Sequence, residues 1–183
     1  MGKFDWFWKA MGSTTERNNK KSKAVVANAH GLIEELSLLD DASLASAVAS
    51  TVRDGAIADK PRFLAGLSVA SQRTLGMTPF EVQNQAVLRL LEGDVIQMAT
   101  GEGKTLVGAM AATGFALQGK RVHLITVNNY LAARDAEWMR PLVEFFGLTV
   151  AAVTESSTRE ERVTAYRRDV IYAPVTEIGF DHL

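Results

Sequence analysis

The chain has 183 residues, of which 47% are hydrophobic and 22% are charged, values that suit one soluble core-forming domain with room for a helical appendage. Its formal net charge of −1 gives no overall attraction to nucleic acid, and its lack of cysteine excludes a disulfide scaffold, a thiol nucleophile and thiolate metal sites. We find no apolar run of about 18 residues and no secretory signal, so we expect a cytoplasmic protein.

Residues 1–23 differ from the rest and are predicted to form an amphipathic basic N-terminal segment and linker. Four apolar side chains fall at i, i+3, i+4 and i+7, on one face of a short helix: Phe4, Phe7, Trp8 and Met11. Basic residues flank this face, so it could lie in an anionic membrane surface. The alternative, which amphipathic helices follow more often, is that the helix packs on its own protein.

Residues 24–76 are predicted to be helical and to carry no chemistry. The first helix has an apolar stripe made of Leu32, Ile33, Leu36 and Leu39. Asp40 and Asp41 can cap a second helix that ends at Gly55, and Pro61 opens a third helix that Gly76 closes.

From residue 77 to residue 183 the pattern changes to alternating strands and helices. We expect strands at residues 94–99, 121–127, 148–154 and 169–173, with helices at 79–91, 104–117, 129–146 and 158–167. This order predicts an α/β fold with a parallel sheet and helices on both faces, preceded by the α-helical N-terminal segment.

A glycine-rich turn joins the first predicted strand to its helix and reads Thr-Gly-Glu-Gly-Lys-Thr over residues 100–105. This is the form of a phosphate-binding P-loop, in which glycines let backbone N–H groups, here those of Gly101, Glu102 and Gly103, point at phosphate oxygens. Lys104 is expected to reach the β- and γ-phosphates, and the Thr105 hydroxyl to ligate Mg²⁺. The loop therefore predicts binding of ATP with Mg²⁺, with Lys104 and Thr105 as catalytic residues. Met98 stands where the general pattern has its first glycine.

A glutamine precedes the P-loop strand on the predicted helix from residue 79. The amide of Gln83 has both a donor and an acceptor and can match the exocyclic amine and N7 of adenine together. Phe80 could flank the base, so this helix is predicted to contribute to the nucleotide site.

Five stretches together resemble SecA, the motor ATPase of bacterial protein export. They are residues 77–83 (MTPFEVQ), 98–105 (MATGEGKT), 123–139 (HLITVNNYLAARDAEWM), 146–150 (FGLTV) and 177–183 (EIGFDHL). The resemblance covers roughly residues 60–183 and includes Met98, since SecA proteins look the same there. Residues 7–9 (FWK) and 12–18 (GSTTERN) look like the accessory, second-copy SecA of actinobacteria.

The resemblance implies roles for single residues. Gln83 would read adenine with Met77 and Phe80 beside it, and residues 101–105 would hold the phosphates and Mg²⁺. Arg134 matches a family arginine near the nucleotide, although a surface ion pair with Asp135 is the alternative for it. The implied fold is an incomplete RecA-like nucleotide-binding domain of the DEAD-like type.

The resemblance also implies an activity and partners. SecA proteins are translocases that couple ATP hydrolysis to export of preproteins through a SecYEG-type channel, from the cytoplasmic face of the cell membrane. It implies no nucleic-acid partner and leaves open whether the intact protein forms a homodimer.

One part of an ATPase is missing from the sequence. Turnover needs a Walker B carboxylate after a later strand, and no Asp-Glu pair follows an apolar strand anywhere in the chain. We therefore expect an N-terminal fragment of a longer translocase, which binds ATP and does not turn it over alone.

Two other functions are compatible with a P-loop. A helicase-like nucleic-acid motor of superfamily 2 shares the loop and the upstream glutamine, and it would bind single strands in a salt-dependent way. The chain could also be a non-catalytic binding fragment that docks through residues 1–23.

Overall fold

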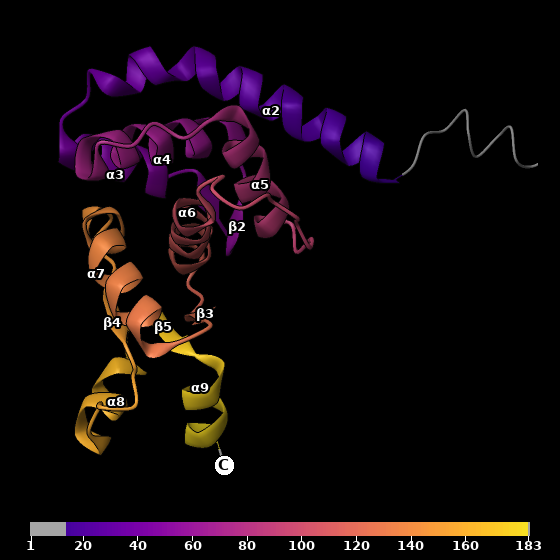
Figure 1. Cartoon of the computed structure of the whole chain (residues 1–183). Helices are drawn as coiled ribbons and strands as arrows, with labels where there is room; N and C mark the ends of the chain where they lie inside the picture. The colour runs from indigo at the N-terminus through magenta and orange to yellow at the C-terminus, as the bar shows by residue number, and fades with distance from the viewer. Residues whose placement is uncertain (1–13, 183) are drawn as a thin grey trace, which may run out of the picture.

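The computed structural model describes residues 14–182, which form a helical layer followed by an α/β layer (Figure 1). The helical layer contains α2 (Thr14–Ser37), α3 (Asp41–Ala49), α4 (Lys60–Leu75) and α5 (Glu81–Leu91), with a small hairpin of β1 (Val52–Arg53) and β2 (Ala56–Ile57). The α/β layer contains α6 (Lys104–Leu117), β3 (Val122–Thr126), α7 (Asn129–Phe145), β4 (Val150–Ala152), α8 (Arg159–Ala165), β5 (Val170–Pro174) and α9 (Val175–His182). The predicted α/β fold preceded by helices is confirmed.

The N-terminal helix starts earlier than the pattern indicates. Helix α2 begins at Thr14, so residues 14–23 continue the helix that was expected from residue 24. The aromatic face predicted for residues 4–11 lies outside the described residues. Within the described part of the chain, none of the helices is both long and apolar enough to cross a membrane.

Helix α4 is the centre of the helical layer. Its residues 63–71 are all buried, and α2 packs along it and reaches α5 (Figure 1). Asp59 caps its start by accepting a hydrogen bond from Arg62 N, and Gly76 ends it in the left-handed conformation with φ 68°. The predicted boundaries at Pro61 and Gly76 are thus confirmed, because each residue has the backbone geometry that its position requires.

The prediction that Gly55 ends the second helix is wrong. Helix α3 ends at Ala49, and Asp54 and Gly55 form the two-residue turn between β1 and β2. Both turn residues have positive φ, 52° and 72°, which is the geometry that an Asp-Gly hairpin turn favours.

The sheet has the order β3-β5-β4, and all of its pairs are parallel. The central strand β5 is buried on both faces: Val170 and Tyr172 belong to the core cluster that includes α7, and Ile171 and Ala173 pack with residues of α8 and α9. Helices therefore cover both faces of the sheet, as the strand–helix alternation predicted.

The segment 94–99, predicted as the first parallel strand, is not part of the sheet. It has no ladder partner among the described residues, and Val95 in it is 99% exposed. A parallel strand needs a neighbour to exchange hydrogen bonds with, and β3 pairs with β5 alone. The described sheet accordingly has three strands rather than the four expected.

Close packing of α3 on α4 yields a test of the fold. A Cβ added to Gly66 would overlap Val48 Cγ2, whereas Gly31 on α2 has open space around it. Gly66→Ala is expected to lower the free energy of unfolding by about 1–3 kcal/mol. Gly31→Ala is expected to raise it by about 0.5–1 kcal/mol, because alanine is the better helix former. Urea unfolding of both variants measures this, and equal effects would contradict the α3–α4 packing.

Candidate nucleotide-binding site

The predicted P-loop leads directly into a helix. Residues 100–103 form a turn, Gly103 is the N-cap of α6, and Lys104 is the first residue of that helix. Gly101 and Gly103 both take the left-handed conformation, with φ 87° and 75°. The N–H groups at the start of α6 lack helical partners, which is the general arrangement that suits an anion.

The loop is held by bonds of its own side chains to Ala99. The Glu102 carboxylate accepts a hydrogen bond from Ala99 N at 2.7 Å, and Lys104 Nζ donates to Ala99 O, also at 2.7 Å. Both side chains are exposed, and Thr105 lies in the first turn of α6, partly exposed. A phosphate group reaching the loop would thus meet Lys104 and the Thr105 position on the same turn.

Gln83 connects the loop to the helical layer. It is 6% exposed; its Oε1 accepts from Phe80 N at 2.8 Å and its Nε2 donates to Glu102 O at 2.9 Å. A Cβ on Gly103 would overlap this Nε2. Each amide atom keeps one further hydrogen-bonding position, a donor on Nε2 and an acceptor on Oε1, which is the pair that adenine requires.

The two neighbours predicted for the base, Met77 and Phe80, both precede the first residue of α5. Phe80 is its N-cap residue and is 73% exposed, while Met77 is partly buried against the core. The structure brings Phe80 and Gln83 together through their hydrogen bond, so an exposed aromatic ring and an amide occupy the same helix start.

The described hydrogen bonds and ion pair of Arg134 are made within its own helix and not with the loop. Its Nε and Nη2 both donate to Asp135 Oδ1, at 2.8 and 2.6 Å, and its guanidinium lies over the Tyr130 ring at 5.7 Å. The bond to the Asp135 carboxylate raises the pKa of Arg134. The structure thus shows the ion pair that the sequence left as the alternative, on the helix next to α6.

No group of three or more His, Asp or Glu side chains gathers into a metal site within residues 14–182. Thr105, the predicted Mg²⁺ ligand, is the second residue of α6. The hollow described below lies elsewhere, between α7, β4 and α8.

Sequence reasoning missed two features of the loop. The first is the Glu102 bond to Ala99 N, and the second is the contact of Gln83 with Gly103. A glutamine at the third position of a helix is a recognised capping signal, and that signal could have placed the Gln83 Oε1 on Phe80 N.

Comparison with known proteins shows the family to which the chain belongs. Residues 7–183 match the model of the SecA DEAD-like domain. The chain is 62% identical over its whole length to protein translocase subunit SecA 2 of Corynebacterium efficiens and 60% identical to that of Corynebacterium glutamicum strain R. It is 51% identical over 97% of its length to SecA 2 of Mycolicibacterium smegmatis. It spans 24%, 24% and 23% of these relatives, respectively.

Two glycine variants can separate the effect of the Gln83–Gly103 contact on the free energy of unfolding from the effect of backbone strain. Gly101→Ala and Gly103→Ala both force alanine into the left-handed region, which costs about 1–2 kcal/mol. Only the second also overlaps Gln83, since nothing surrounds Gly101 within 4 Å. We expect Gly103→Ala to lower the free energy of unfolding by about 1–3 kcal/mol more than Gly101→Ala does. Adding Gln83→Ala should remove most of this difference in chemical unfolding, and its persistence would contradict the contact.

Proposed function

Since the chain belongs to the SecA DEAD-like domain family, we propose that it is the ATP-binding part of a SecA-type motor that couples ATP hydrolysis to export of preproteins. The observation that carries the proposal is the loop itself: two left-handed glycines open α6, and the buried Gln83 is bonded to the loop between them. Names of the relatives as protein translocase subunits support the same function.

The residues present fit ATP with Mg²⁺. The N–H groups of residues 101–105 would hold the phosphates, because glycines leave the approach to the loop open. Lys104 would exchange its bond with Ala99 O for phosphate oxygens. Thr105 would hold Mg²⁺, which neutralises charge on the phosphates when bound. Gln83 would present its remaining donor and acceptor to adenine beside Phe80.

Partners and location follow from the same proposal. The motor would act on preproteins at a SecYEG-type channel, in the cytoplasm and on the cytoplasmic side of the cell membrane. Residues 1–23 would contribute contact with an anionic membrane surface, and the intact protein would be a candidate homodimer. Arg134 would join the nucleotide site only after leaving Asp135.

Adenine recognition by Gln83 can be tested against its role in holding the loop. We expect Gln83→Ala to weaken ATP binding about tenfold and inorganic tripolyphosphate binding much less, because the latter has no base. If Gln83 acts only by positioning the loop, both ligands will be weakened equally, and the adenine role is wrong. Calorimetry with Mg²⁺ measures both affinities.

Two lysines serve as controls for that experiment. Lys104→Ala should weaken both ligands at least tenfold, since it removes a phosphate contact. Lys120→Ala should weaken neither, because Lys120 lies beyond the far end of α6 over the Phe115 ring.

Hydrolysis is expected to need more than these residues. The described part of the chain offers no carboxylate cluster to hold Mg²⁺ through water and to orient an attacking water. The purified 183-residue chain should therefore hydrolyse ATP at a negligible rate in a phosphate-release assay. Robust turnover that Lys104→Ala abolishes would refute this expectation.

A further inference from the structure

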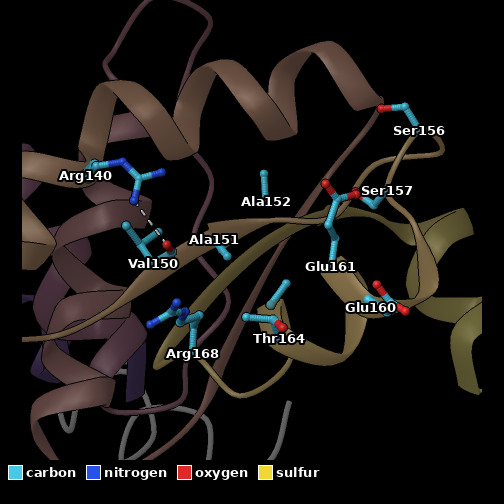
Figure 2. Close-up of a pocket in the computed structure, with 11 residues that line it drawn as sticks. Arg140, Val150, Ala151, Ala152, Ser156, Ser157, Glu160, Glu161, Thr164 and Arg168 are labelled. Atoms are coloured by element: carbon cyan, nitrogen blue, oxygen red, sulfur yellow. Dashed lines mark hydrogen bonds between the residues drawn. The ribbon is translucent and has the colours of Figure 1, made fainter.

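A hollow of about 610 Å³ lies along the outer edge of the sheet, away from the P-loop. Figure 2 shows it bounded by Arg140 of α7, the strand β4, and residues of α8 and the turns at either end of it. Small side chains line its middle: Ala151, Ala152, Thr164 and Ala165. The proposed nucleotide site uses none of these residues.

Strand β4 is an edge strand, and its hydrogen bonds show which residues face outward. Val170 N donates to Thr149 O at 3.0 Å, and Val153 N donates to Tyr172 O at 2.8 Å. Backbone groups alternate in direction along a strand, so residues 149, 151 and 153 face β5, and Val150 and Ala152 face the hollow.

One of the outward-pointing main-chain groups of β4, the C=O of Val150, already has a hydrogen-bond partner. Arg140 Nη1 donates to Val150 O at 3.2 Å, as Figure 2 shows. The N–H and C=O of Ala152 point outward, and neither bonds to another main-chain group of the described chain. In an antiparallel pair, one opposing residue exchanges both hydrogen bonds with such a residue. Ala152 is therefore the natural pairing point for an added strand.

Charges of opposite sign lie at the two ends of the hollow (Figure 2). Arg140 and Arg168 lie at the Val150 end, and Glu160 and Glu161 lie beyond Ala152. Glu161 is engaged in capping α8, since it accepts from Thr158 N at 2.7 Å. Glu160 and Arg168 are exposed and form no ion pair with another described side chain.

We propose that the β4 edge binds an extended peptide antiparallel to β4, with a basic residue, any residue, and an acidic residue in that order. The middle residue pairs with Ala152. Its two neighbours point to the α8 side, as Ala151 does, because side chains alternate along a strand. The antiparallel direction then puts the basic side chain at Glu160 and the acidic one at Arg168.

A peptide of a partner protein fits these charges better than a second copy of this edge does. Residues 149–153 of the chain read Thr-Val-Ala-Ala-Val and carry no charge. Pairing two copies of β4 would thus leave both charged ends of the hollow without a matching side chain from the strand. Strand addition gives main-chain affinity, and the flanking charges give the direction and the selectivity.

Two labelled peptides of identical composition test the proposal. One has the centre Lys-Val-Glu and the other Glu-Val-Lys, each flanked by two threonines and capped at both ends. Fluorescence anisotropy with the 183-residue chain at low salt should show the first binding about fivefold more tightly, from two surface ion pairs. Equal affinity for the two, or no binding of either, would overturn the proposal.

Single proline substitutions in β4 separate the role of its outward N–H groups in peptide binding from the role of its inward N–H groups in pairing with β5. Ala152→Pro removes an N–H that points outward, so the chain should stay folded while peptide binding falls at least about tenfold. Ala151→Pro removes an N–H that faces β5 and should destabilise the chain. Unchanged peptide binding by a folded Ala152→Pro variant would contradict pairing at this edge.

A change on the peptide gives the same answer without altering the protein. N-methylation of the central valine removes the donor that faces Ala152 and should abolish binding, whereas N-methylation of the following glutamate removes a donor that points away. Equal effects of the two methyl groups would overturn the pairing.

Two further measurements complete the test. Glu160→Gln with Arg168→Gln should reduce the preference between the peptides to less than about twofold. Dimerisation in sedimentation analysis that Ala152→Pro abolishes, without peptide binding, would show that a second copy occupies the edge and would overturn the peptide proposal.

Discussion

The hydrogen bonds of Gln83 join the two layers of the molecule at the point where the site is formed. Gln83 accepts from Phe80 N at the start of α5 and donates to Glu102 O in the loop, 19 residues further along the chain, so one amide joins a helix start to a turn. The approach is so close that a Cβ at residue 103 would overlap Gln83 Nε2. The helical layer would thus be part of the proposed nucleotide site and not only an appendage, because Gln83 of α5 is bonded to the loop.

The position of the loop also depends on how α6 packs in the core. Helix α6 packs against α5 on one side and against α7 and β3 on the other, and its buried residues are mostly small, as in Ala109, Ala112 and Ala116. Gly114 allows Leu91 of α5 and Phe63 of α4 to approach. A helix with small side chains can lie close to several neighbours at once, which holds its N-terminus in place. At the other face of the sheet, Arg162 fixes α9 by bonds to Glu177 and Asp181.

Local signals were sufficient for some elements and not for others. The glycine at position 76, the proline at position 61 and the loop from residue 100 each require a backbone geometry that few residues allow, and all three were predicted. The Asp54–Gly55 turn was missed because a glycine after a helix reads as a helix end unless the two short strands around it are recognised. That residues 94–99 lie outside the sheet could not be predicted, because an apolar run favours a strand but does not identify the strand with which it would pair. For the same reason the bond from Gln83 to Glu102 O, 19 positions away, was beyond sequence reasoning, whereas its local bond to Phe80 N carries a capping signal.

Phosphate binding at this loop would be an exchange of hydrogen bonds. The Lys104 ammonium and the Glu102 carboxylate both bond to Ala99, and their opposite charges cancel within the loop. The loop as a whole therefore carries little net charge to attract an anion. What remains is the set of N–H groups that the start of α6 and the turn before it leave without helical partners. The positive φ of Gly101 and Gly103 sets the direction of the N–H groups around them, so selectivity for phosphate would reside in the backbone geometry of two glycines, and Lys104 would add strength once its bond to Ala99 O is given up.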